Sequence, residues 1–235
     1  MIVIGDVHGR WVDLRERLQA GNVRDEHLVQ VGDFGLGFEE PRAEARHLAM
    51  LDRYLTQHGC FLWAIHGNHD EPARWAPGAP QPWNAIRLVP DDTIIEVEGK
   101  RLLCAGGAIS VDRQTRRHGG YWPDEAFILA PERLQRLDLT GLYAVVTHTA
   151  PEGVYPYYLG PLVTAYALGD SRLIADVVAE RARIGQFRAL IDERAEPPFW
   201  WYGHFHEHMV EQVGPTRFVL LDMLQCYDPQ TGRTW

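Results

Sequence analysis

Side chains able to bind a metal ion or move a proton occur in five short clusters, and each cluster follows an apolar run. The sharpest cluster is Gly67-Asn68-His69-Asp70, where an amide, an imidazole and a carboxylate share one turn. From average residue usage, this tetrapeptide has on the order of one chance in a thousand of occurring in a chain of this length. The other four clusters are Asp6-Val7-His8, Gly32-Asp33, Thr147-His148 and Gly203-His204-Phe205-His206. Five such elements in one chain indicate a shared site.

Seven of these side chains form a donor set suited to divalent metal ions. The set combines two carboxylates, one amide oxygen and four imidazoles: Asp6, Asp33, Asn68, His8, His148, His204 and His206. Alternate residues of an extended segment point to the same side, so Asp-x-His and His-x-His can direct two donors at one centre. Seven donors without a thiolate exceed the needs of one tetrahedral zinc ion, and therefore favour two ions. Mn²⁺ is the ion that we expect at this site, with iron, zinc or nickel as alternatives.

The elements that must position these donors alternate between strands and helices in the first third of the chain. Apolar runs at 2–5, 28–32 and 61–66 predict strands, and residues 11–20 and 41–58 predict helices between them. This βαβαβ order implies a parallel sheet. Because ligands bind beyond the carboxyl ends of strands in such sheets, the clusters that follow the strands are expected to converge.

Beyond residue 70 the pattern changes. Residues 71–92 carry five prolines, which predicts a long irregular excursion. The turn Glu98-Gly99-Lys100 between two apolar runs predicts a β-hairpin, and Asp170 is expected to cap a helix that extends to about residue 191. The further predicted strands cover residues 142–147, 199–203, 209–213 and 218–221.

Length and composition are those of one globular domain. The 235 residues are 46% hydrophobic and 23% charged, so residues 1–235 are interpreted as a single domain. The amino terminus lacks a secretory pattern, no apolar stretch approaches the roughly 20 residues that span a bilayer, and the three cysteines are widely spaced. These features favour a cytoplasmic protein without membrane association. Because the net charge of −9 repels polyanions, nucleic acid is expected only as a substrate at a locally positive site.

Through these clusters, from Gly5 to His206, the chain resembles the calcineurin-like metallophosphoesterases. The resemblance implies an α/β fold, a two-sheet β-sandwich flanked by helices in four α/β/β/α layers. It also implies two ligand sets that share Asp33 as a bridging carboxylate: Asp6, His8, Asp33 and His206 for one ion, and Asp33, Asn68, His148 and His204 for the other.

The activity implied by this resemblance is hydrolysis of a phosphodiester or phosphomonoester by a hydroxide that bridges two metal ions. His69 would protonate the leaving oxygen or stabilise its charge, and Asp70 would orient His69 as carboxylates orient imidazoles. A turn or helix-capping role is the alternative for Asp70. His66 has no place in the ligand set and is interpreted as structural. The expected substrate is a small phosphate ester or a nucleotide, and the sequence assigns no partner protein.

Two departures from the sequence motifs of serine/threonine protein phosphatases weaken the assignment of that activity to this chain. Those phosphatases carry Gly-Asp-x-x-Asp-Arg-Gly, whereas Gly32-Asp33 here is followed by Phe-Gly-Leu-Gly-Phe, without the phosphate-gripping arginine. They also have glutamate where this chain has Asp70. Substitute contacts to phosphate or to a base are expected from the glycine-rich segment 106–122, namely Arg113, Arg117, His118 and Tyr121. A solvated loop is the alternative for that segment.

A non-catalytic scaffold, which keeps the fold as a binding surface as some members of such a family do, is the second class of function. A scaffold has no physical need for seven converging donors. The donor set therefore favours an enzyme.

Overall fold

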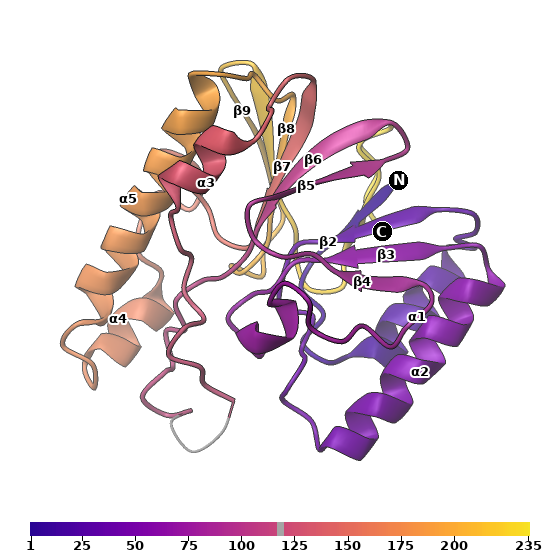
Figure 1. The fold of residues 1–235 in the computed structure, drawn as a ribbon. Coiled ribbons are helices and arrows are strands. Elements are labelled where there is room, and N and C mark those ends of the chain that lie inside the picture. Colours follow the sequence, from indigo (N-terminus) through magenta and orange to yellow (C-terminus); the bar gives the residue numbers. More distant parts are fainter. Residues whose placement is uncertain (117–119) are drawn as a thin grey trace.

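The computed structural model describes residues 1–116 and 120–235 and consists of two β-sheets packed face to face (Figure 1). Helices α1 (Trp11–Ala20) and α2 (Pro41–Gln57) cover the outer face of the first sheet, while α3 (Pro131–Arg136) and α5 (Leu173–Asp192) cover the second. The four-layer α/β/β/α arrangement expected from the sequence is confirmed.

The first sheet has the strand order β11-β1-β2-β3-β4. Its strands are β1 (Ile2–Ile4), β2 (His27–Gln30), β3 (Phe61–Ala64), β4 (Ile86–Leu88) and β11 (Cys226–Tyr227). Strands β1 to β4 pair in parallel, and β11 pairs antiparallel with β1. Because α1 connects β1 to β2 and α2 connects β2 to β3, the predicted βαβαβ order is confirmed.

Helix α2 begins where its sequence supplies a cap and a proline. The Glu40 side chain accepts hydrogen bonds from the backbone N–H groups of residues 42 and 43, and Pro41 fills the first helical position, where its missing N–H costs nothing. Leu48, Leu51 and Leu55 recur at spacings of three and four and are buried against the sheet. The helix thereby fixes the loop that precedes it.

The second sheet has the strand order β5-β6-β7-β8-β10-β9. Its strands are β5 (Thr93–Val97), β6 (Lys100–Ala105), β7 (Leu142–Thr147), β8 (Phe199–Tyr202), β9 (Met209–Val213) and β10 (Thr216–Leu220). The four central strands are parallel, and the edge strands β5 and β9 are antiparallel to their neighbours. The predicted hairpin is β5 and β6, joined by a turn in which Glu98 and Gly99 both have positive φ.

The core lies in three layers because successive side chains of a strand point to opposite faces. In β1, Ile2 and Ile4 face the helices while Val3 faces the other sheet. In β8, Trp200 faces α5 and Trp201 lies between the sheets. A strand buried on both faces reads as an uninterrupted apolar run, which explains the sequence pattern of these strands.

Parts of the fold differ from the sequence expectation. The segment 71–92 contains the 3₁₀ turn η1 (Pro72–Trp75) and strand β4, which completes the first sheet. Helix α4 (Pro161–Ala167) was not expected, and none of its residues is buried. The long helix α5 starts close to its predicted position, and the Asp170 carboxylate accepts the backbone N–H of Arg172 at 3.1 Å.

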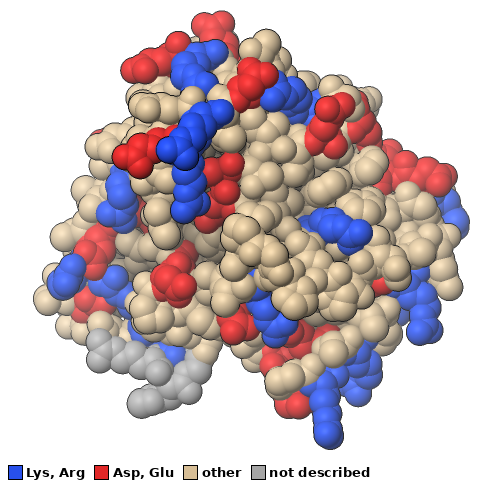
Figure 2. Space-filling model, viewed as in Figure 1, with Lys and Arg blue, Asp and Glu red and all other residues tan. Residues whose placement is uncertain are grey.

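The surface carries both signs of charge. On the face shown in Figure 2, acidic and basic side chains are interspersed, so the net charge of −9 is not gathered into one patch there. In the part of the chain that the structure describes, no helix combines the length and apolar character required to cross a membrane.

Candidate metal centre

The seven candidate ligands meet at the carboxyl ends of strands from both sheets. The first sheet supplies four of them, after β1, β2 and β3: Asp6, His8, Asp33 and Asn68. The second sheet supplies three, after β7 and β8: His148, His204 and His206. Because the parallel strands of each sheet end at one edge, ligands far apart in the sequence become neighbours.

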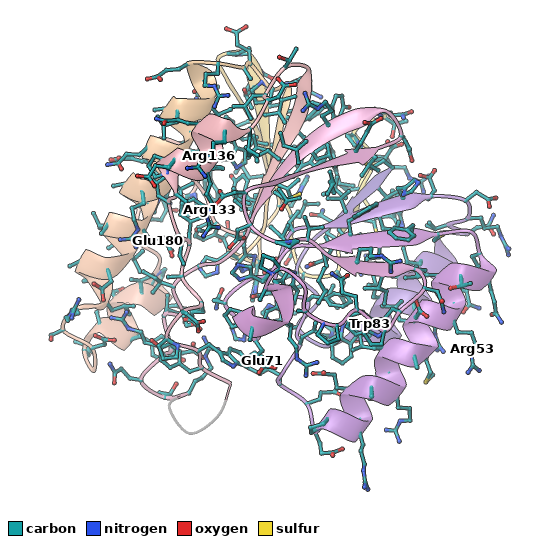
Figure 3. All side chains as sticks on the ribbon, viewed as in Figure 1. Arg53, Glu71, Trp83, Arg133, Arg136 and Glu180 are labelled. Atoms are coloured by element: carbon teal, nitrogen blue, oxygen red, sulfur yellow. The ribbon has the colours of Figure 1, made fainter. Side chains whose placement is uncertain are left out.

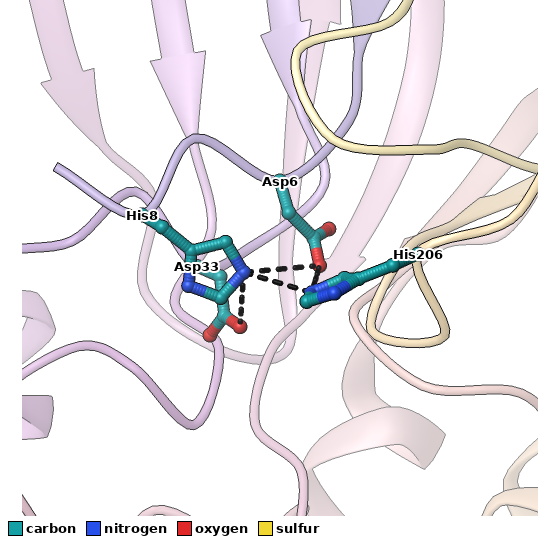
Figure 4. Close-up of side chains that lie close together, drawn as sticks. All are labelled: Asp6, His8, Asp33 and His206. Atoms are coloured by element: carbon teal, nitrogen blue, oxygen red, sulfur yellow. Dashed lines mark hydrogen bonds and ion pairs between the residues drawn. The ribbon is translucent and has the colours of Figure 1, made fainter. Parts of the chain in front are cut away.

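Four side chains form the first ligand group, which Figure 4 shows in close-up. One donor atom from each of Asp6, His8, Asp33 and His206 lies within 4.8 Å of the others. His206 Nε2 lies 3.2 Å from Asp6 Oδ2, and His8 Nε2 lies 3.5 Å from Asp33 Oδ2. The two imidazole Nε2 atoms are 2.9 Å apart. The group thus has the size of a coordination sphere.

A second ligand group adjoins the other oxygen of Asp33. His148 Nε2 lies 3.3 Å from Asp33 Oδ1 and 3.1 Å from Asn68 Oδ1. His204 Nδ1 lies 2.8 Å from Asn68 Oδ1. Asp33 therefore presents one oxygen to each group, which is the geometry of a bridging carboxylate.

The ligand atoms are arranged to bind cations, because the lone pairs of their nitrogen and oxygen atoms point into a shared space. His148 Nδ1 lies 2.9 Å from the Val31 carbonyl, which can only accept, so the ring donates its Nδ1–H there and turns Nε2 toward Asp33 and Asn68. Second-sphere bonds of this kind orient metal-binding imidazoles in proteins. Carboxylate, amide oxygen and imidazole nitrogen suit divalent ions of the manganese, iron or zinc type.

The electrostatic field of the centre also favours cations. Asp6 and Asp33 are buried, with 0% and 1% of their surface exposed. Burial opposes the charged form of Asp33, but His148 and His8 outweigh it and hold the pKa of Asp33 well below its usual range. Burial likewise disfavours a charged His148, but Asp33 and Asp6 raise its pKa to about 10. Buried carboxylates thus favour positive charge at this position.

Backbone strain is concentrated at the ligands. Four of them have left-handed backbone conformations, with φ of 51° at His8, 56° at Asp33, 72° at His204 and 50° at His206. Each such residue costs of order 1–3 kcal/mol, and such strain persists where the surrounding structure enforces it, often at functional sites. Here the backbone N–H of His8 donates to the Asp33 carbonyl at 2.7 Å, and that of His204 to Asp6 Oδ2 at 3.0 Å.

Two glycines leave the space that the ligands occupy. A Cβ atom at Gly203 would overlap Asp6 Oδ1, and one at Gly67 would overlap Asp33 Oδ1 and lie 2.6 Å from His148 Nε2. Any side chain at either position would displace a ligand. The glycines of the two clusters are therefore explained by close packing around the centre.

His69 lies beside the first ligand group. Its ring is 4.7 Å from the His8 ring and stacks on Phe38 with centroids 5.0 Å apart, while its backbone N–H donates to Asp33 Oδ1 at 2.6 Å. Burial, together with the charges of Arg116 and His8, lowers the pKa of His69 to about 4 against the opposing effect of Asp33. The imidazole is therefore neutral at neutral pH, a form that can donate an N–H hydrogen bond but is a poor source of a proton.

Asp70 binds backbone N–H groups and not the His69 ring, so its expected role in orienting His69 is not supported. Both Asp70 oxygens accept backbone N–H groups: Oδ1 from Gly35 at 2.6 Å and Leu36 at 3.0 Å, and Oδ2 from Gly67 at 2.8 Å and Phe34 at 3.0 Å. No hydrogen bond joins Asp70 to the His69 ring among the described residues. Asp70 instead ties the loop after β2 to the loop after β3, which fixes the spacing of Asp33 and Asn68.

Of the four expected substrate contacts, the two that the structure describes, Arg113 and Tyr121, lie away from the ligand groups. Arg113 forms ion pairs with Asp170 at 2.6 Å and Asp176 at 2.7 Å, so its guanidinium is already committed to two carboxylates and the expected phosphate contact is not supported. Tyr121 lines a cavity of about 340 Å³ with these three residues, and none of the seven described ligands lines it. Arg117 and His118 lie outside the described residues.

Arg116, which lies in the same glycine-rich stretch but is not one of the four expected contacts, reaches the centre instead. Its Nη1 lies 3.5 Å from the backbone carbonyl of Asn68, and its guanidinium lies 5.8 Å from the centroid of the Phe38 ring. The signal in the sequence is its spacing of four residues from Asp112, to which its Nε donates at 2.7 Å. That spacing favours an ion pair but does not mark a site. His66 bonds Asp91 at 3.1 Å, away from the ligand groups, as a structural histidine would.

Comparison with known proteins gives one family and several related folds. Residues 1–208 match the family model described as calcineurin-like phosphoesterase. A Staphylococcus aureus protein assigned as a 5'-nucleotidase is 12% identical with a TM-score of 0.54, and the match covers 99% of this chain and 51% of that one. An archaeal phosphodiesterase is 11% identical with a TM-score of 0.40, covering 100% and 98% of the two chains. At such identities the likeness concerns the fold. A search of curated protein sequences gave no match.

Proposed function

Because the chain belongs to the calcineurin-like phosphoesterase family, we propose that it hydrolyses phosphate esters with two divalent cations held at the candidate metal centre. The observation that carries this proposal is the pair of ligand groups on the two oxygens of Asp33. Bound there, two cations would polarise a phosphoryl group and lower the pKa of a water molecule that attacks phosphorus. Mn²⁺ is the ion we propose, with iron, zinc or nickel as alternatives.

The protein's own residues have distinct parts in this proposal. Asp6, His8 and His206 would hold one ion, Asn68, His148 and His204 would hold the other, and Asp33 would contribute one oxygen to each. His69, neutral at neutral pH and next to His8, donates a hydrogen bond to the leaving oxygen as negative charge develops on it. Of the two roles considered for His69, its low pKa supports stabilisation of charge over protonation.

The substrate class we propose is a small phosphodiester, a phosphomonoester or a nucleotide. The staphylococcal fold relative, assigned as a 5'-nucleotidase, makes a nucleotide a natural first compound to test. The missing arginine after Asp33 argues against a protein phosphatase, because nothing in that loop replaces its grip on phosphate.

The experiment is a comparison of two chromogenic esters with added Mn²⁺. The purified chain should hydrolyse bis-p-nitrophenyl phosphate, p-nitrophenyl phosphate or both, and the ratio of the two rates measures the preference for diester over monoester. His204→Ala should abolish turnover, whereas His27→Ala, at the opposite end of β2 from Asp33, should retain it. If two Mn²⁺ ions bind but neither ester turns over under several metals, the result favours the scaffold alternative.

A further inference from the structure

Asn68 poses an orientation problem that the carboxylate ligands do not have. A carboxamide offers lone pairs from its oxygen and only donors from its nitrogen, so it can bind a cation in just one of two flipped orientations. In this structure Asn68 Oδ1 faces His148 and His204, and the opposite end of the amide is turned toward residues 106–116. Whatever contacts that end determines whether Asn68 can act as a ligand.

The contact is the hydroxyl of Ser110. Asn68 Nδ2 donates to Ser110 Oγ at 3.0 Å, and both side chains are buried, with 3% and 0% of their surface exposed. A second donor, Arg116 Nη2, also bonds Ser110 Oγ. Because the guanidinium and the amide nitrogen can only donate, they occupy the two lone pairs of the hydroxyl.

The Ser110 backbone is held by Glu125. The Ser110 backbone N–H donates to Glu125 Oε1 at 2.8 Å, and Arg116 Nη2 lies 3.8 Å from Glu125 Oε2. Burial raises the pKa of Glu125 to about 7, and the hydrogen bond from the Ser110 backbone opposes that rise. A flipped Asn68 would bring its oxygen to a Ser110 hydroxyl that is held in place by Arg116 and by this backbone bond, and it would lose the hydrogen bond that Asn68 Nδ2 donates to that hydroxyl.

A second buried carboxylate fixes the segment that carries Ser110. Glu180 projects from α5 toward this segment, where it accepts the backbone N–H of Ile109 at 3.1 Å and that of Phe127 at 3.4 Å (Figure 3). Because α5 is a long helix packed on the second sheet, Ser110 is positioned by a rigid element. A helix outside the ligand set thus contributes to the geometry of Asn68.

We propose that Ser110, held by Arg116 and Glu125, is a positioning residue that keeps the Asn68 oxygen turned toward the second ligand group and thereby sets the affinity for the second cation. This inference rests on the binuclear centre proposed above. Loss of partners that orient a ligand typically weakens metal binding by about 10- to 100-fold. The effect is confined to one of two ions, because Asn68 belongs to one ligand group.

The test is a titration of the metal-free protein with Mn²⁺ alone, with free Mn²⁺ measured by electron paramagnetic resonance. In Ser110→Ala, one Mn²⁺ should bind about 10- to 100-fold more weakly than in the wild type, and the other should bind unchanged. Ser171→Ala, at an exposed serine, is the matched control and should bind both ions as the wild type does. Arg116→Gln removes a donor from the same network at a side chain that is 11% exposed, and should also weaken one ion.

A double-mutant cycle separates orientation from general damage. In an Asn68→Asp background both ligand oxygens are acceptors, so the side chain has no wrong orientation. Adding Ser110→Ala to that background should therefore cost little further affinity, which appears as a non-additive cycle. Additive losses, equal weakening of both ions, or unchanged binding in Ser110→Ala would each overturn the inference.

The same titration distinguishes this inference from the proposed function. A wild-type chain that binds one Mn²⁺ only would overturn both. A chain that binds two ions but hydrolyses neither ester would count against the proposed hydrolysis alone, and the affinity of the second ion in the variants would still decide the role of Ser110. If Ser110→Ala does not fold, judged by its circular dichroism, Arg116→Gln and its cycle with Asn68→Asp decide.

Discussion

Asp70→Asn tests whether Asp70 joins two loops or orients His69. The Asp70 carboxylate accepts four backbone N–H groups, two on each oxygen. An asparagine retains one oxygen, so two N–H groups, for example those of Phe34 and Gly67, would face an NH₂ group. Two hydrogen bonds to a charged acceptor contribute about 1.5–3 kcal/mol each. Because burial raises the pKa of Asp70 to about 7, burying its charge already costs free energy, and the lower end applies.

We therefore expect Asp70→Asn to lower the free energy of unfolding by about 3 kcal/mol. At about 2–4 °C per kcal/mol for a chain of this size, the melting temperature should fall by roughly 6–12 °C. The measurement is thermal and urea unfolding of the metal-free protein, so that weakened metal binding does not contribute to the difference.

The matched control is Asp13→Asn, the same change in a side chain that is 45% exposed and paired with Arg10 at 2.7 Å. A surface ion pair is worth about 0–1 kcal/mol, so this variant should melt close to the wild type. If Asp70→Asn is as stable as the control and slows turnover as much as His69→Ala does, Asp70 acts on His69 and the role assigned here is refuted.

The remaining predictions concern three other residues. His69→Ala should keep both Mn²⁺ ions in a titration but slow ester hydrolysis by about 10²- to 10⁴-fold; loss of metal would show that the residue is a ligand instead. Gly203→Ala should lose metal binding because its methyl group would overlap Asp6 Oδ1, whereas Gly160→Ala, where a Cβ meets nothing within 4 Å, should not. Burial raises the pKa of Glu180 to about 7, above its value of 4.5 in the unfolded chain. The protonated carboxyl group of Glu180 therefore stabilises the folded protein fully below about pH 4.5, and this stabilisation is lost as the pH rises toward 7. Between about pH 4.5 and pH 7 the free energy of unfolding of the wild type should fall by about 3 kcal/mol more than that of Glu180→Gln, which cannot ionise at this position. If the two proteins show the same pH dependence in urea unfolding, the prediction is contradicted.

The arrangement of strands and ligands could be predicted because both depend on local sequence. Each ligand cluster directly follows an apolar run, and strands of a parallel sheet end at one edge, so order along the chain was enough to bring Asp6, Asp33 and Asn68 together. The same rule extended to His148 and His204 in the second sheet, although no local pattern says which sheet a strand joins.

The partners of polar side chains could not be predicted, because they depend on where separate loops meet. Asp70 is two residues from Asn68, but its hydrogen bonds go mainly to residues 34–36, which only the folded sheet brings near. The sequence indicated no partner for the Arg113 guanidinium. In the structure it is paired with Asp176 of α5, which lies 63 residues later in the chain. Ser110 had no marker in the sequence, because its contact with Asn68 joins residues that lie 42 positions apart.

The ligands of the centre span the chain from Asp6 to His206, and this span determines when the centre can exist. A fragment or growing chain that ends before β7 would carry Asp6, His8, Asp33 and Asn68 but none of the three imidazoles of the second sheet. Its loops would also lack the contacts through which His148 and His204 meet Asn68. Both ligand groups proposed here are therefore complete only after the second sheet has assembled on the first.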